Sequence, residues 1–178
     1  MKHRIIIIGA GGHGKAVFET ILAQNKFEIT GFADASITIG TIIIPGYKVI
    51  ASLNNLDSLR TLADYFIVAI GNNKIRKQLY DSLKQHMEPA TIIHPSATIS
   101  PTATIGKGNV VLSGAIINTH VSTGENTIIN SGAIIDHDCK IGSHIHLAIG
   151  TIVGSNTDIG SDFTTEIGDR IKSFSKIS

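Results

Sequence analysis

The second half of the chain repeats in units of six residues, and this repeat restricts the folds that the chain can adopt. Counted from Thr91, the third position is aliphatic in eleven of twelve successive hexads, from Ile93 to Ile159, and Thr123 is the exception. A helix would repeat near 3.6 residues, whereas unbroken hexads are typical of a parallel β-helix in which each hexad forms one flat side. We therefore predict a column of stacked coils.

The dimensions and interior of this column follow from the count. With three sides per turn, the 72 residues from Thr91 to Asp162 make four coils, and a strand spacing of about 4.8 Å makes the column roughly 19 Å tall. Stacked isoleucine and valine would fill it, which explains why aromatic residues are only 5% of the sequence. We expect the hexads to end there, because residues 163–170 no longer keep the pattern.

The residues before the hexads alternate between hydrophobic strands and amphipathic helices. This order is typical of a small Rossmann-like α/β domain with a βαβ-type parallel sheet. We therefore expect two domains, residues 1–88 and residues 89–178. The sequence predicts strands at residues 5–8, 27–33, 46–50 and 65–70, helices at residues 15–24 and 74–86, and the start of a further helix at residues 52–56.

A glycine cluster follows the first predicted strand. Residues 9–14 read G-A-G-G-H-G, which satisfies G-x-G-x-x-G directly before a helix, and Asp34 stands at the end of the next strand. Glycines let the backbone approach a phosphate, and the helix N-terminus supplies free N–H donors. The short domain favours a nucleotide-linked ligand over NAD, while a structural turn without a ligand stays open.

Polar residues interrupt the hexads at one place. His137 stands at the fifth position of its hexad, near a corner, and the adjacent Asp138 could fix its tautomer and raise its basicity, as suits a general base. A solvated corner is the plainer alternative. Zinc is another, with His144 and His146 as further ligands, but the three histidines occupy different hexad positions, so we predict no metal.

Composition excludes several classes of function. The formal charge is +1, which gives no electrostatic argument for nucleic acid or for an anionic membrane. Cys139 is the single cysteine, so no disulfide forms within the chain. The apolar run at residues 5–8 is too short for a signal peptide or a membrane span. We expect a cytoplasmic protein.

Three separated segments carry a family resemblance. They are GAGGHGK at residues 9–15, FIVAIGNNKIR at residues 66–76 and NSGAIIDHDC at residues 130–139. Together they resemble the sialic acid O-acetyltransferase and UDP-4-amino-sugar N-acetyltransferase family. The resemblance implies a nucleotide-sugar-binding first domain, a left-handed β-helix, a homotrimer, and acetyl-CoA bound in the groove between neighbouring columns.

The same resemblance implies roles for individual residues. His137 would be the general base and Asp138 would orient it, while Asn130, His146 and Ser155 would contact acetyl-CoA. Ser155 replaces a glycine of the relatives whose N–H faces the thioester oxygen, and Asp34-Ala35 stands where relatives often have two acids. The nucleotide sugar would contact Gly11, Gly12, His13, Asp34, Gly71 and Asn72.

These observations predict an acetyl-CoA-dependent transferase that N-acetylates a UDP-linked 4-amino sugar in surface glycan synthesis. By comparison with the family, the hexads stop early, so we also expect a C-terminus that is truncated and a weakened acetyl-CoA site. Two alternatives stay open: O-acetylation of sialic acid, and an impaired protein that only binds nucleotide sugars.

Overall fold

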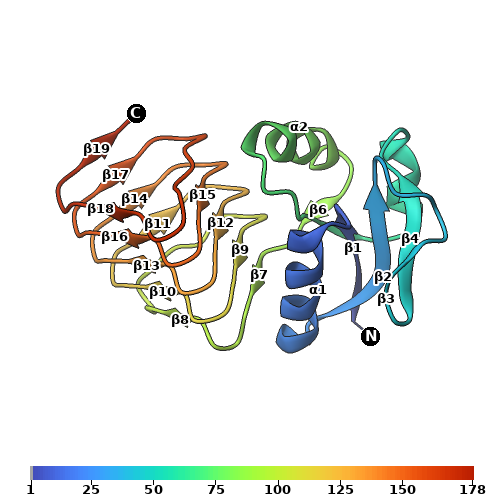
Figure 1. Ribbon diagram of the computed structural model, residues 1–178, viewed down its shortest axis with the longest axis horizontal. Helices are drawn as coiled ribbons and strands as arrows, with labels where there is room; N and C mark the ends of the chain where they lie inside the picture. The colour runs from blue at the N-terminus through green and yellow to red at the C-terminus, as the bar shows by residue number, and fades with distance from the viewer. Residues whose placement is uncertain (1) are drawn as a thin grey trace. The chain divides into compact units, whose positions relative to one another are not determined.

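The computed structural model describes residues 2–178, which form two compact units with a boundary between Ile92 and Ile93. We expected this boundary after residue 88. Each unit has its own hydrophobic core. The first is built from a sheet and helices, and the second from stacked coils (Figure 1).

The first unit is organised around one buried strand. Residues 5–8 of β1 are all 0% exposed and lie between two parallel neighbours, β2 and β5, as expected of a continuous β-branched run. Helix α1 packs against β1 and β2, and α2 packs against β5. The sheet order is β3-β4-β2-β1-β5-β6, parallel except for the β3–β4 pair. The elements are β1 (His3–Ile8), α1 (Gly12–Gln24), β2 (Phe27–Asp34), β3 (Ile42–Ile44), β4 (Tyr47–Ser52), a 3-10 helix (Leu56–Thr61), β5 (Tyr65–Val68), α2 (Asn73–Leu83) and β6 (Glu88–Pro89).

The expected helix start at residues 52–56 is wrong in position. Ser52 is the last residue of β4, where it pairs with Asp34 of β2, and the helical turn begins only at Leu56. Pairing across the sheet therefore outweighs the local preference of this segment.

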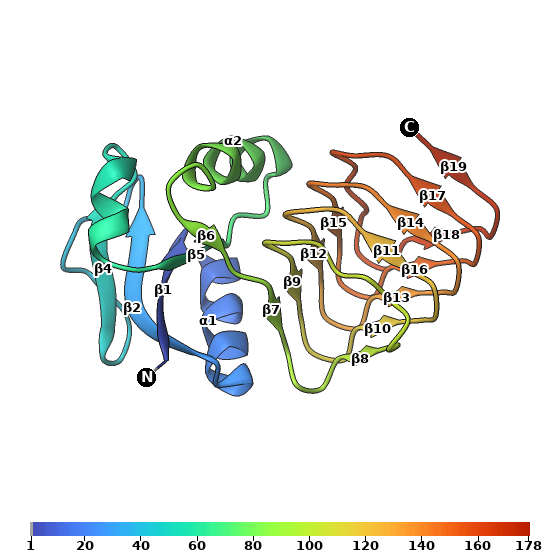
Figure 2. The ribbon, with the colours of Figure 1, turned by 180° about the vertical axis from the view of Figure 1, so that it is seen from behind.

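The second unit is a left-handed parallel β-helix, so both parts of the predicted fold class are confirmed. Paired strands are 18 residues apart, for example Ile116 with Ile134 and then Ile152, which makes three sides per coil (Figure 2). The first side contains β8 (Thr98–Ile99), β10 (Ile116–Ile117), β13 (Ile134–Ile135), β16 (Ile152–Val153) and β18 (Arg170–Ile171); the second side contains β11 (Ser122–Thr123), β14 (Lys140–Ile141), β17 (Asp158–Ile159) and β19 (Lys176–Ile177); the third side contains β7 (Ile92–Ile93), β9 (Val110–Val111), β12 (Ile128–Ile129) and β15 (His146–Leu147).

The hexads do not end near Asp162, so that expectation is wrong. Arg170 pairs with Ile152, and Lys176 pairs with Asp158, in the same 18-residue register as the earlier coils. The sequence did not show that the hexads continue, because the third position of the next hexad is the polar residue Thr165. Thr165 is 3% exposed, and its hydroxyl accepts a hydrogen bond from the Ala148 N–H at 2.8 Å. A satisfied threonine thus replaces an aliphatic residue without an unpaired polar group.

Candidate functional site

A cavity of about 760 Å³ lies at the carboxyl ends of β1, β2 and β5 in the first unit. Such an edge is where doubly wound sheets bind ligands. Five of the six residues predicted to contact a nucleotide sugar line it. They are Gly11, Gly12, His13, Asp34 and Gly71. The sixth, Asn72, is not among its lining residues; its side chain caps α2 by accepting a hydrogen bond from the Ile75 N–H at 3.0 Å.

The glycines of residues 9–14 have two roles: Gly14 allows α1 to pack closely against the end of β1, and Gly11 and Gly12 leave open space beside the helix. A Cβ on Gly14 would stand 2.2 Å from the Gly9 carbonyl oxygen, so a glycine is required where α1 approaches β1. In the described part of the chain, no atom lies within 4 Å of a Cβ built on Gly11 or Gly12. Their backbone therefore leaves space beside the N-terminus of α1, which is suited to a phosphate.

Asp34 is held by the backbone around it. One carboxylate oxygen accepts a hydrogen bond from the Ala10 N–H at 2.9 Å, and the other accepts bonds from the N–H groups of Ser36 and Ile37. Burial acts to raise the pKa of Asp34, but these hydrogen bonds outweigh it and leave the pKa lowered. Asp34 thus ties the glycine cluster to the end of β2, and direct contact with a ligand stays a prediction.

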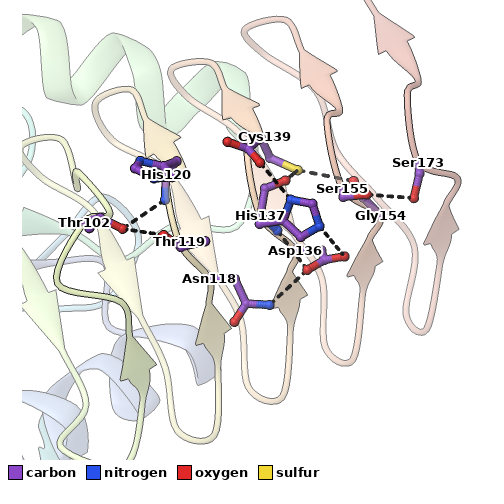
Figure 3. A network of polar contacts seen from close by, with 11 residues as sticks. Thr102, Asn118, Thr119, His120, Asp136, His137, Cys139, Gly154, Ser155 and Ser173 are labelled. Atoms are coloured by element: carbon purple, nitrogen blue, oxygen red, sulfur yellow. Dashed lines mark hydrogen bonds and ion pairs between the residues drawn. The ribbon is translucent and has the colours of Figure 1, made fainter.

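In the second unit, His137 lies at the corner between the first and second sides, where it is 47% exposed (Figure 3). Its Nδ1 is 2.8 Å from Asp138 Oδ2. An ionised carboxylate only accepts hydrogen bonds, so Nδ1 donates to Asp138 and the neutral ring carries its lone pair on Nε2. Asp138 has a φ of 59°. The residues at the same place one coil before and one coil after it, His120 and Asn156, also have positive φ angles, of 56° and 54°.

Two carboxylates control the protonation of this ring. The hydrogen bond that His137 donates to Asp138 is the main cause that raises the pKa of His137. Desolvation opposes it, and the negative charges of Asp136 and Asp138 raise the pKa further. A protonated ring cannot accept a proton. The pair therefore makes His137 a stronger base than a free imidazole.

We expect Asp138→Asn to lower the pKa of the His137 ring, because the charge-assisted hydrogen bond is lost. An NMR titration of the imidazole resonances measures this directly. Asp158→Asn, which removes the same charge from β17, is the matched control and should leave the titration unchanged. An equal pKa in the wild type and in Asp138→Asn would contradict the assigned geometry.

The three residues predicted to contact acetyl-CoA divide into two places. Ser155 lies one coil beyond His137 at the same corner, where the Asn156 N–H donates to the His137 carbonyl at 3.0 Å, and the Ser155 hydroxyl donates to Ser173 (Figure 3). Asn130 lies at the corner between the third and first sides, and its amide is 3.3 Å from Nε2 of His146 on β15. One chain therefore places Ser155 beside His137, and Asn130 and His146 elsewhere: Asn130 at another corner and His146 on the third side.

The zinc alternative gains no support from the geometry. His144 is buried at the corner between the second and third sides, 2.9 Å from the Asn126 amide, and His146 lies on the third side. Among residues 2–178, no group of three or more His, Cys, Asp and Glu side chains could hold a metal ion. In the same part of the chain, no helix is long and apolar enough to cross a membrane.

Sequence reasoning missed Asn118. Its amide donates to Asp136 Oδ1 at 3.1 Å, one coil below the His137 corner. The signal was present in the sequence, because residues that are 18 apart in such a column lie side by side, and Asn118 is 18 residues before Asp136.

The fold is that of a hexapeptide-repeat β-helix preceded by a Rossmann-like domain. Residues 4–83 match the family model of the PglD N-terminal domain. The chain is 31% identical to a histidine variant of perosamine N-acetyltransferase from Caulobacter crescentus, solved in complex with CoA and GDP-perosamine, and covers 90% of it with a TM-score of 0.81. It therefore belongs to the UDP-4-amino-sugar N-acetyltransferase family.

Further relatives agree with this assignment. The chain is 36% identical over 116 residues to the UDP-N-acetylbacillosamine N-acetyltransferase of Bacillus subtilis (strain 168), matching 61% of this chain and 51% of the relative. It covers 96% of the acetyltransferase domain of PglB from Neisseria gonorrhoeae, solved in complex with acetyl coenzyme A, at 29% identity and a TM-score of 0.76; 99% of this chain is aligned. The match with the Bacillus protein spans about half of that relative's length.

Proposed function

We propose that the protein transfers the acetyl group of acetyl-CoA to the amine of a UDP-linked 4-amino sugar in surface glycan synthesis. The observation that carries the proposal is the His137–Asp138 pair, with Nδ1 held by a carboxylate and Nε2 carrying the lone pair. The relatives support it, since several of them are named as N-acetyltransferases of nucleotide-linked amino sugars or are solved with CoA. We also propose that the protein is cytoplasmic.

In the proposed reaction the neutral amine of the sugar attacks the thioester carbon of acetyl-CoA. A C–N bond forms, the amine nitrogen gives one proton to His137 Nε2, and the C–S bond breaks. The thiolate then takes that proton and leaves as the CoA thiol, which returns His137 to its neutral form. Asp138 holds the tautomer and stabilises the imidazolium that forms between the two proton transfers.

The first unit would hold the nucleotide. Its 760 Å³ cavity is large enough for a nucleoside diphosphate, and the glycine cluster offers backbone donors beside the α1 N-terminus. Gly11, Gly12, His13 and Gly71 are the residues that we assign to this contact.

We also propose that the active form is a homotrimer with acetyl-CoA bound between neighbouring columns. Asn130 lies at a different corner of the column from His137, and its contact His146 lies on the third side. A site that combines them with His137 and Ser155 would therefore take residues from two copies, which a trimer of side-by-side columns provides. Sedimentation equilibrium measures the mass directly: a trimer is expected, and a monomer that retains full activity would contradict this arrangement.

Calorimetry with acetyl-CoA separates this enzyme from a protein that only binds nucleotide sugars. We expect saturable binding of acetyl-CoA and, in a separate titration, of UDP. Binding of UDP without any binding of acetyl-CoA at millimolar concentration would overturn the transferase and leave a nucleotide-binding function.

A further inference from the structure

A buried arginine contacts the turn that joins β5 to α2 (Figure 2). Arg76 lies in the first turn of α2, is only 1% exposed and is not among the residues that line the cavity of the first unit. A guanidinium stays protonated at any physiological pH, so a fixed positive charge lies inside the domain. Charged side chains are almost never fully buried unless they are paired, and the groups that this charge meets are therefore informative.

The guanidinium donates hydrogen bonds to the turn itself. Nη1 donates to the carbonyl oxygens of Ile70 at 3.2 Å and of Gly71 at 3.1 Å, and Nη2 donates to the side-chain oxygen of Asn73 at 2.7 Å. Ile70 and Gly71 both line the cavity. Arg76 thus fixes the backbone of two lining residues without lining the cavity itself.

These hydrogen bonds set the direction in which the turn presents its polar groups. No peptide bond among residues 2–178 is cis, and a trans peptide points its C=O and its N–H to opposite sides. Because Arg76 holds the carbonyls of Ile70 and Gly71, the N–H groups of Gly71 and Asn72 point away from the guanidinium. On that side the turn presents donors instead of acceptors, as an anion site requires.

The same turn packs against the glycine cluster. A Cβ on Gly9 would stand 2.8 Å from Ile70 Cγ1 and 2.9 Å from the Ala69 carbonyl oxygen, so the two segments are in direct contact. Gly9, Ala69, Ile70 and Gly71 all line the cavity. A shift of the turn would therefore displace both segments that we assign to the nucleotide.

We propose that Arg76 is a positioning residue for the diphosphate of the nucleotide, because it keeps the Ile70 and Gly71 carbonyls turned away from the ligand and places a positive charge behind the turn. Without it, these carbonyl oxygens would be free to rotate toward the cavity, where their partial negative charge repels phosphate. A buried charge is also screened much less than an exposed one, so it attracts the diphosphate through the turn. The inference rests on the proposed function and adds how its nucleotide site selects a phosphorylated ligand.

The test compares UDP with uridine, which lacks the diphosphate. Both are titrated by calorimetry, at one salt concentration and without acetyl-CoA, into the wild type and Arg76→Gln. Glutamine removes the charge and keeps one amide donor group for the turn. We expect the affinity of Arg76→Gln for UDP to fall about tenfold and its affinity for uridine to stay within about twofold of the wild type. A purely structural role would weaken both ligands to the same extent.

Two further variants separate the charge from its surroundings. Arg76→Lys keeps the charge but has no planar fork to hold two carbonyls, so it should recover part of the UDP-to-uridine affinity ratio. Lys77→Gln removes a positive charge from the next residue of α2, which is partly exposed and pairs with Asp81 at 3.7 Å, and should keep the wild-type ratio. An unchanged ratio in Arg76→Gln, or an equal loss in Lys77→Gln, would overturn the inference.

Asn73→Ala keeps the test decisive if Arg76→Gln does not fold. It removes the acceptor of Nη2 at a partly exposed position of α2, where alanine suits a helix. The guanidinium is then held less firmly, and we expect the UDP-to-uridine ratio to fall about threefold. If Arg76→Gln is unfolded and Asn73→Ala has the wild-type ratio, Arg76 acts in folding alone and the inference is overturned.

The outcomes also separate this inference from the proposed function. If the wild type binds neither UDP nor uridine, the proposed nucleotide site fails and the inference fails with it. If the wild type binds UDP and transfers acetyl groups but the ratio does not depend on Arg76, the function stands and only the role of Arg76 fails. If the ratio depends on Arg76 but the wild type transfers no acetyl group, the transferase fails and the role of Arg76 in binding stands.

Discussion

His137→Ala is expected to lower kcat for acetyl transfer by roughly 10²–10⁴, the range that a positioned general base contributes. The Asp138 carboxylate fixes the ring so that Nε2 is the accepting atom. Without the ring, only solvent can take the proton from the amine as the C–N bond forms. Alanine leaves the backbone contacts of this corner in place, because the His137 N–H and carbonyl both remain.

The measurement is steady-state release of CoA thiol with a UDP-linked 4-amino sugar. His120→Ala is a matched control, since His120 lies at the same corner one coil earlier and is exposed. The control should keep the wild-type rate, and both variants should keep the wild-type affinity for UDP. A wild-type kcat in His137→Ala would eliminate the base assignment.

Gly14→Ala is expected to destabilise the first unit by about 2 kcal/mol or more. Alanine within a helix normally stabilises it by about 1 kcal/mol relative to glycine. Here the added Cβ would stand 2.2 Å from the oxygen and 3.0 Å from the carbon of the Gly9 carbonyl, and neither backbone can move unless α1 separates from the end of β1. Overpacking of this kind costs about 1–3 kcal/mol in cores with more freedom to adjust.

Gly12→Ala is the matched variant in the same cluster. Among the described residues, no atom lies within 4 Å of its added Cβ, and Gly12 lines the cavity. We expect its urea unfolding midpoint to equal or exceed that of the wild type, while its affinity for UDP falls about tenfold because the methyl group occupies ligand space. Wild-type stability in Gly14→Ala would contradict the packing that we describe.

The sequence predicted those parts of the fold that have a local period. The buried run at residues 5–8 and the aliphatic third positions of the hexads each identify an element from its own neighbours in the chain. Ser52 and Thr165 were misjudged because their roles depend on partners far along the chain. Ser52 continues a strand through its pairing with Asp34, and Thr165 enters the core because Ala148 and Thr151 satisfy its hydroxyl.

In the candidate site, too, contacts between neighbouring residues could be predicted from the sequence, and contacts with distant residues could not. His137 and Asp138 are adjacent in the sequence, and their pairing could be predicted from that fact alone. Asn118 acts on Asp136 from one coil away, which becomes visible only after the 18-residue register is applied. Asp34 was predicted to contact the ligand, but its hydrogen bonds to the Ala10, Ser36 and Ile37 backbone depend on loop geometry that no local pattern encodes.

The most direct test of the function is an acceptor panel with acetyl-CoA and the wild-type protein. The panel contains UDP-linked 4-amino sugars, CMP-linked sialic acid and free sialic acid, and mass spectrometry identifies the acetylated product. We expect a UDP-linked amino sugar to gain one acetyl group on nitrogen, with one CoA thiol released for each acetyl group. Acetylation of sialic acid alone, or no acetylation of any acceptor, would contradict the account.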